Sequence, residues 1–83
     1  MNIMSDINNK YLKEIGQIIL ELRKEKNISQ EELSELADIH RTYLSDIERG
    51  KRNLTVVVLR RVIDALHIKM SEFFEMVEKE RFK

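Results

Sequence analysis

The sequence contains no cysteine, no proline and only two glycines, Gly16 and Gly50, in 83 residues. Without cysteine, the chain can form neither a disulfide nor a thiolate zinc site. Without proline, and with so little glycine, it has few residues that interrupt helices. Its longest uninterrupted apolar run is four residues, far short of the ~20 that a membrane-spanning helix needs. The sequence therefore predicts a small all-helical protein, which we expect to be cytoplasmic because its N-terminus has no signal-peptide pattern.

The formal net charge is zero, but the charges are unevenly distributed along the chain. Residues 29–39 carry no cation and four carboxylates, which belong to Glu31, Glu32, Glu35 and Asp38. Residues 41–61 carry six Lys or Arg against two carboxylates, a local balance of +4. Because phosphate neutralisation supplies much of the affinity for nucleic acid, this basic segment is a candidate DNA-binding region despite the neutral total.

The spacing of apolar residues predicts five helices, at about residues 8–26, 30–37, 41–49, 55–66 and 70–81, within a single domain that spans residues 1–83. Ser29 followed by Glu32 is a capping-box pattern, and Thr55 can cap the fourth helix. Asp38 is expected to interrupt the chain before the third helix, and Gly50 to end that helix. The short connections predict compact packing, and the heptads of a coiled coil are missing.

The second and third predicted helices are joined by a tight turn and carry apolar residues where they would cross, with the small Ser34 between them. This pattern is typical of a helix-turn-helix, whose second helix lies in the major groove of DNA. The stretches "IGQIILELR", "ISQEEL", "IERGKRN" and "LTVVVLRRVIDALHI" resemble the lambda-repressor-like (XRE/Cro) helix-turn-helix family. Within it, "RTY", "IER", "RNLT" and "FFEM" look most like the controller proteins of restriction-modification systems. The resemblance covers residues 12–77 and implies a compact five-helix, all-α DNA-binding domain.

The start of the third helix is expected to reach the edges of DNA bases. Arg41 can donate two hydrogen bonds to guanine, and Thr42 offers a hydroxyl and a methyl group. Ser45 lies one turn later on the same face. The resemblance adds Arg52, which in controller proteins can enter a groove and read a base. Asp46 is a weaker candidate, because a carboxylate near phosphate is unfavourable unless it accepts a hydrogen bond from cytosine.

A second set of residues is expected to contact DNA phosphates. Gln30 lies at a helix N-terminus, where N–H groups and the helix dipole favour an anion. Tyr43 can donate its hydroxyl to a phosphate or cover the edge of the core. The resemblance implies an ion pair between Arg23 and Glu48 that ties the first helix to the third, with Arg23 also available to phosphate. The phosphate-binding residues predicted in this way are Arg23, Gln30, Tyr43, Arg49, Lys51 and Asn53.

The last helix carries more large apolar side chains than one face needs for the core of a single chain. The fourth predicted helix likewise carries Val57 and Val58 beyond what it needs inside. The predicted contacts of a two-fold homodimer are therefore Val58, Phe73, Phe74, Met76 and Val77. Such a dimer separates its two recognition helices by about 34 Å and implies a pseudo-palindromic operator. The resemblance also implies activation through acidic residues that touch RNA polymerase, and repression when a second dimer blocks the promoter.

No arrangement of residues in the sequence predicts catalysis, a cofactor or a metal site. His40 and His67 have no cysteine partner and no acidic cluster, and we expect His40 to cap or flank the third helix. We therefore predict a sequence-specific transcriptional regulator without enzymatic activity and without a cofactor. The alternative is an antitoxin-type or other XRE repressor that acts partly through a protein partner, for which the acidic second helix and the last helix are candidate surfaces.

Overall fold

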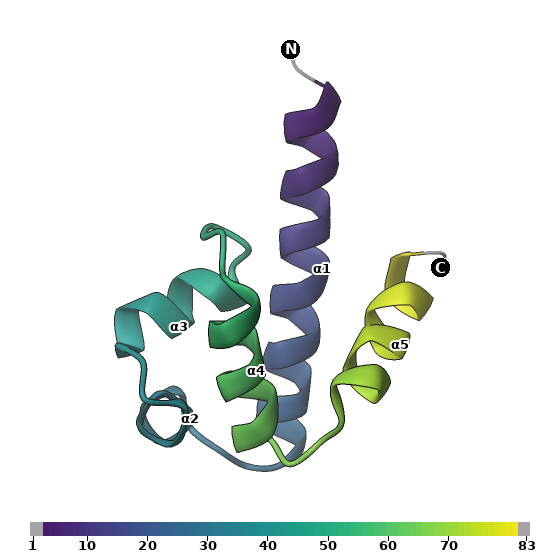
Figure 1. The fold of residues 1–83 in the computed structure, drawn as a ribbon. Coiled ribbons are helices and arrows are strands. Elements are labelled where there is room, and N and C mark those ends of the chain that lie inside the picture. Colours follow the sequence, from purple (N-terminus) through teal and green to yellow (C-terminus); the bar gives the residue numbers. More distant parts are fainter. Residues whose placement is uncertain (1–2, 82–83) are drawn as a thin grey trace.

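The computed structural model describes residues 3–81, which form five α-helices and no strand (Figure 1). The helices are α1 (Ile3–Glu25), α2 (Gln30–Ala37), α3 (Arg41–Glu48), α4 (Val56–Ala65) and α5 (Met70–Arg81). The all-α fold is thus confirmed, and α2 to α5 each begin and end within one residue of the predicted bounds. Residues 1, 2, 82 and 83, which the predicted single domain includes, lie outside the described residues.

The first helix begins earlier than the sequence predicts, at Ile3 rather than near residue 8. Asn8 and Asn9 are weak helix formers, but each costs only about 0.7 kcal/mol relative to alanine. This is too little to stop a helix in a stretch that has no proline and no glycine before Gly16. The first turns of α1 consequently project beyond the other helices (Figure 1).

Side chains cap the first turns of three helices. Ser29 Oγ accepts a hydrogen bond at 3.0 Å from the backbone N–H three residues later, and Thr55 Oγ1 does the same at 3.1 Å. At the start of α3, His40 Nδ1 accepts from the N–H of Thr42 at 3.2 Å. Each contact satisfies an N–H that has no acceptor within its own helix. The predicted caps at Ser29, Thr55 and His40 are therefore confirmed.

Residues in the left-handed backbone region follow three of the helices. The φ angle is 57° at Asn27, 55° at Asp38 and 58° at His67. Asparagine and aspartate adopt this region more readily than most residues. In the α2–α3 turn, the N–H of Asp38 bonds to the carbonyl of Glu35, and the N–H of Ile39 bonds to that of Ser34. Asp38 thus closes α2 and sets the direction in which α3 begins.

One apolar core lies between the helices. α1 packs against α3 and α5, whereas α2 packs against α3 and α4. The largest fully buried side chains are those of Phe73, Ile19, Leu33, Leu44, Ile47, Ile63, Leu66, Val62 and Val77. Because Phe73 and Val77 have no exposed surface in a single chain, the prediction that they contact a dimer partner is wrong. Both side chains fill the core of their own chain, where α5 packs on α1.

Gly16 lies where α1 crosses α3. A Cβ atom at this position would meet the main-chain carbonyl oxygens of Ile47 and Glu48. Backbone atoms inside two packed helices cannot move aside as the end of a flexible side chain can. The close crossing therefore requires glycine, and it places the last turn of α3 directly against α1.

Candidate DNA interface

The first turn of α3 carries the exposed polar side chains of Arg41 and Thr42, and Ser45 is partly exposed one turn later. Residues three and four positions apart lie on one face of a helix, so Ser45 shares a side of α3 with both. Among residues 8–80, whose side chains the structure describes, none of the ion pairs involves Arg41. The three predicted base-reading residues of α3 therefore form one polar surface that can approach a groove.

The carboxylate of Glu48, in the last turn of α3, is buried and fully paired. Arg23 Nε donates to Oε2 at 2.7 Å, and Arg23 Nη2 donates to Oε1 at 3.1 Å. The amide of Gln30 also donates to Oε1, at 2.8 Å, while Arg23 Nη1 donates to the carbonyl of Ile28 at 3.0 Å. The predicted ion pair is therefore present, and it joins α1, α2 and α3 just behind the recognition surface.

This network gives Gln30 and Arg23 a role inside the protein in addition to the predicted phosphate contacts. The sequence predicts only a phosphate contact for Gln30, but its side-chain amide donates a hydrogen bond to Glu48. The Arg23 side chain is 12% exposed and donates through three of its nitrogens within the chain. Both residues thus have a structural role first. The role of Gln30 has no local signal in the sequence, because its partner lies 18 residues further along the chain.

Asp46 accepts hydrogen bonds from two arginines that the sequence predicts to meet DNA. Arg49 Nη2 donates to Oδ1 at 2.7 Å, and Arg52 Nη2 donates to Oδ2 at 3.2 Å. The guanidinium carbon of Arg52 lies 4.8 Å from the ring centroid of Tyr43, within cation–π range. The hydrogen bonds from Arg49 and then Arg52 hold the pKa of Asp46 below its ordinary value, so the carboxylate is charged at neutral pH. We refer to these four residues as the Asp46 cluster.

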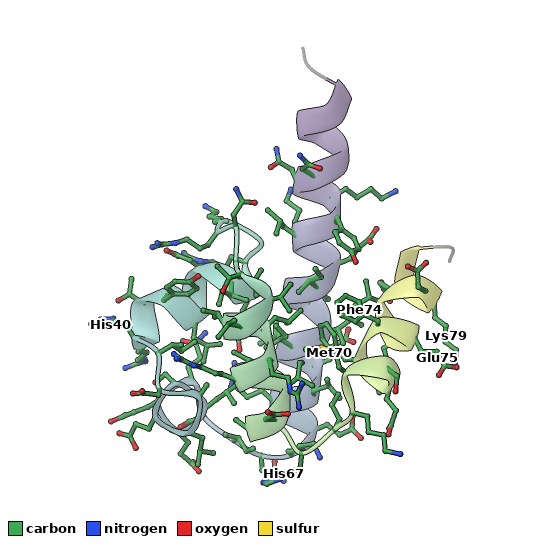
Figure 2. The ribbon with its side chains drawn as sticks, viewed as in Figure 1. His40, His67, Met70, Phe74, Glu75 and Lys79 are labelled. Carbon is green, nitrogen blue, oxygen red and sulfur yellow. The ribbon has the colours of Figure 1, made fainter. Side chains whose placement is uncertain are left out.

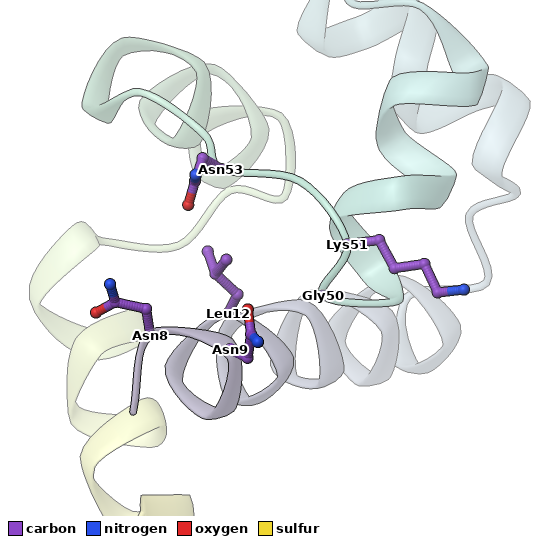
Figure 3. Close-up of a pocket in the computed structure, with 6 residues that line it drawn as sticks. All are labelled: Asn8, Asn9, Leu12, Gly50, Lys51 and Asn53. Carbon is purple, nitrogen blue, oxygen red and sulfur yellow. The ribbon is translucent and has the colours of Figure 1, made fainter. Parts of the chain in front are cut away.

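The loop that follows α3 lies against α1. Gly50 has a φ angle of 69°, and a Cβ atom there would meet the backbone of Lys13. A polar hollow of about 300 Å³ opens between the loop and α1 (Figure 3). Its lining residues are Asn8, Asn9, Leu12, Gly50, Lys51 and Asn53. Asn8 and Asn9 of α1 thus lie beside the exposed residues of the predicted phosphate-binding loop. Neither asparagine is among the site residues predicted from the sequence.

An apolar hollow of about 260 Å³ lies where the start of α4 meets α1 and α5. Its lining residues are Tyr11, Leu12, Ile15, Leu54, Thr55, Val56, Leu59 and Phe74. Val56 is 77% exposed and the adjacent Val57 is 63% exposed, which is unusual for large apolar side chains. Of the five residues predicted to contact a dimer partner, Val58, Phe74 and Met76 keep partly exposed surface.

The two histidines lie well apart in the structure. His40 is at the start of α3, whereas His67 is at the link between α4 and α5 (Figure 2). Among the described side chains, those of residues 8–80, no three of His, Cys, Asp or Glu gather in a way that could hold a metal ion. No helix in this range is long and apolar enough to cross a membrane.

The pattern of the family described as "Helix-turn-helix" matches residues 19–73. The control protein C.MunI of Mycoplasma sp is 42% identical over 78 residues, which are 93% of this chain and 100% of that protein. The solved structure of the wild-type restriction-modification controller protein C.Esp1396I has a TM-score of 0.84 and 38% identity, covering 88% of this chain and 96% of that one.

A second structure of C.Esp1396I is that of a tetramer in complex with its natural 35 base-pair operator. It matches this chain with a TM-score of 0.83 and 38% identity, over 88% of this chain and 96% of that one. The family consists of DNA-binding regulators rather than enzymes. This chain belongs to the helix-turn-helix family of regulators that includes the restriction-modification control proteins.

Proposed function

We propose that this protein is a homodimeric, sequence-specific transcriptional regulator that controls a restriction-modification system by binding DNA upstream of its own gene, in the cytoplasm. The observation that carries the proposal is the surface of α3. Its first turn exposes Arg41 and Thr42, and an exposed polar loop with Lys51 and Arg52 follows its end. The 42% identity to C.MunI over nearly the whole chain supports this class of regulator.

Base readout is assigned to the first turns of α3. Arg41 donates to the O6 and N7 atoms of a guanine, while Thr42 and Ser45 contact neighbouring bases. Arg52 enters an adjacent groove from the loop. Phosphate contacts come from Tyr43, Arg49, Lys51 and Asn53, and from the remaining donors of Arg23 and Gln30. These contacts fix the position of α3 on the duplex, and the base contacts give the sequence preference.

The homodimer is formed through the exposed apolar residues at the start of α4 and the partly exposed residues of α5. Val56 and Val57 expose apolar surface beside the hollow that Phe74 lines, and a symmetric partner would remove this surface from water. A two-fold dimer then presents two copies of α3 to successive major grooves, about 34 Å apart. We expect a pseudo-palindromic operator for this reason.

The direction of control depends on how many dimers are bound. One dimer leaves the acidic face of α2 available to RNA polymerase, since Glu31, Glu32 and Glu35 are all exposed there. A second dimer on the same DNA blocks the promoter. The structure of the C.Esp1396I tetramer in complex with its natural 35 base-pair operator supports this model, because four chains of that relative share one operator.

A protein partner is the second candidate function, and one observation favours it. Leu36 is 62% exposed on α2 and lines a surface hollow of about 430 Å³ together with Arg61, Asp64 and His67. A protein partner that covers this hollow would remove the apolar surface of Leu36 from water. An antitoxin-type or other XRE repressor would use such a surface beside its DNA-binding face.

Fluorescence anisotropy separates the two candidates. The protein is titrated against a labelled duplex from upstream of its own gene and against a scrambled duplex of equal length and composition, at several salt concentrations. A preference for the upstream duplex, with affinity that falls steeply as salt rises, supports the regulator. Equal and weak binding to both duplexes would refute it and favour the protein partner.

A further inference from the structure

We propose that Asp46 is a specificity-determining residue of the DNA interface. By holding Arg49 and Arg52, its carboxylate weakens binding to DNA of arbitrary sequence more than it weakens binding to the operator. The inference rests on the proposed function, because it assigns a role within the same interface. It concerns a residue that the sequence places only as a weak candidate for direct contact with a base.

The geometry puts one anion behind two cations. Both oxygens of Asp46 are engaged, one with Arg49 at 2.7 Å and the other with Arg52 at 3.2 Å. The Asp46 side chain is 21% exposed, whereas those of Arg49 and Arg52 are 57% and 48% exposed. A phosphate that approaches the cluster therefore meets guanidinium groups first, but with half of their charge already cancelled.

This arrangement weakens non-specific binding in particular. Binding to DNA of arbitrary sequence comes almost wholly from the neutralisation of phosphates by lysine and arginine. The carboxylate of Asp46 competes for the two arginines and repels the phosphates. Exposed ion pairs of this kind are weak, so DNA can displace the carboxylate, but each displacement reduces the gain from the phosphate contact.

Binding to the operator keeps the pairing. Arg52 uses only Nη2 to bind Asp46, and an arginine has five N–H donors, so others remain for a base. The ring of Tyr43, 4.8 Å from the guanidinium carbon, supports the group from a second direction. Two contacts thus orient Arg52 before DNA arrives, which lowers the side-chain entropy that is lost on binding. The two arginine side chains, 57% and 48% exposed, cover the Asp46 carboxylate, which is 21% exposed, so we assign Asp46 a role through the arginines rather than as an acceptor from cytosine.

The test is Asp46→Asn, measured by anisotropy on the upstream and scrambled duplexes across a salt series. The variant keeps the size of the side chain and removes its charge. We expect affinity for the scrambled duplex to rise about threefold to tenfold, with a salt slope steeper by about 1 per chain, because one cancelled cation is freed. Affinity for the upstream duplex should stay the same or fall, so that the ratio of the two affinities decreases at least ~threefold.

Asp64→Asn is the matched control, because Asp64 is also an exposed aspartate paired with an arginine, at 3.2 Å, but on α4 outside the proposed interface. It should leave the affinity ratio unchanged. In an Arg52→Ala background, the effect of Asp46→Asn on the ratio should shrink, as coupled residues require. Circular dichroism checks that each variant keeps its helices.

Three results would overturn the inference. If Asp46→Asn raises the affinity for both duplexes equally, Asp46 acts only by general repulsion of phosphate. If it lowers both affinities equally, Asp46 supports the fold instead. If the ratio of the two affinities matches that of the Asp64→Asn control, Asp46 has no role in specificity. If the wild-type protein itself does not prefer the upstream duplex, the proposed function fails instead. In that case an unchanged salt slope for Asp46→Asn on the scrambled duplex would still overturn the idea that Asp46 holds the arginines back.

Discussion

Replacing Glu48 with glutamine should destabilise the fold much more than the loss of an exposed ion pair does. The variant keeps the shape of the side chain but removes the charge that Arg23 binds through two nitrogens, at 2.7 and 3.1 Å. The side chains of Glu48 and Arg23 are 3% and 12% exposed, so water cannot replace the lost partner fully. The guanidinium would remain inside the chain without its counter-charge.

The expected loss is about 3 kcal/mol of unfolding free energy. Removing one partner of a buried ion pair costs roughly 3–5 kcal/mol, because an uncompensated charge stays behind. Arg23 keeps its hydrogen bond to the carbonyl of Ile28 and some contact with water, which places the loss at the lower end. For a domain of this size, such a loss lowers the Tm by about 12–24 °C.

Urea unfolding followed by circular dichroism measures this loss, and an unchanged m value would show that the unfolded state is unaffected. Asp64→Asn is the control, because the Arg60–Asp64 pair on α4 is exposed and should contribute only about 0–1 kcal/mol. A second variant, Arg23→Met with Glu48→Gln, should recover part of the loss, since no buried charge remains unpaired. A loss for Glu48→Gln as small as that of the control would refute the reasoning.

Four further variants test the interface, the helix crossing and the dimer. Arg41→Ala should relax the preference for one base pair by about 1–3 kcal/mol, whereas Lys51→Ala should weaken binding to all duplexes alike and reduce the salt slope. Anisotropy on single-base variants of the operator measures both effects. If the two variants change the affinities in the same way, the assignment of Arg41 to bases and Lys51 to phosphates is wrong. Gly16→Ala should lower the unfolding free energy by about 1–3 kcal/mol, because its Cβ meets the carbonyl oxygens of Ile47 and Glu48. Urea unfolding measures this loss. An unchanged midpoint of unfolding would show that α1 and α3 can separate at no cost. Val57→Glu should shift the protein from dimer to monomer in analytical ultracentrifugation while its helices remain, and a variant that stays dimeric would move the interface away from the start of α4.

Features that depend on neighbours in the sequence were predictable. The caps at Ser29 and Thr55 depend on an N–H three residues later, and the left-handed turn at Asp38 depends on the residue type itself. The apolar period located α2 to α5 for the same reason. The Arg23–Glu48 pair spans 25 residues, and only the resemblance to a known family indicated it.

Features that depend on packing were not predictable in the same way. The apolar residues of α5 read alike in the sequence, yet Phe73 and Val77 are fully buried while Phe74 and Met76 keep some surface. Which side of a terminal helix faces its own chain is decided by the angle at which it returns to α1. The Asp46 cluster was missed because Arg52 reaches back to α3 from the loop, over six residues, and local helix spacing gives no sign of this contact.

The pairing of the arginines also bears on the salt dependence of DNA binding. The sequence offers five cations for the interface, namely Arg23, Arg41, Arg49, Lys51 and Arg52. Glu48 cancels the charge of Arg23, and Asp46 cancels one of the two charges in its cluster. Three effective cations per chain remain, so a dimer should show a slope of log K against log salt near about −5, rather than the ~−9 that five would give. A measured slope near −9 would mean that DNA breaks both pairings, and that Asp46 and Glu48 restrain their arginines only in the free protein.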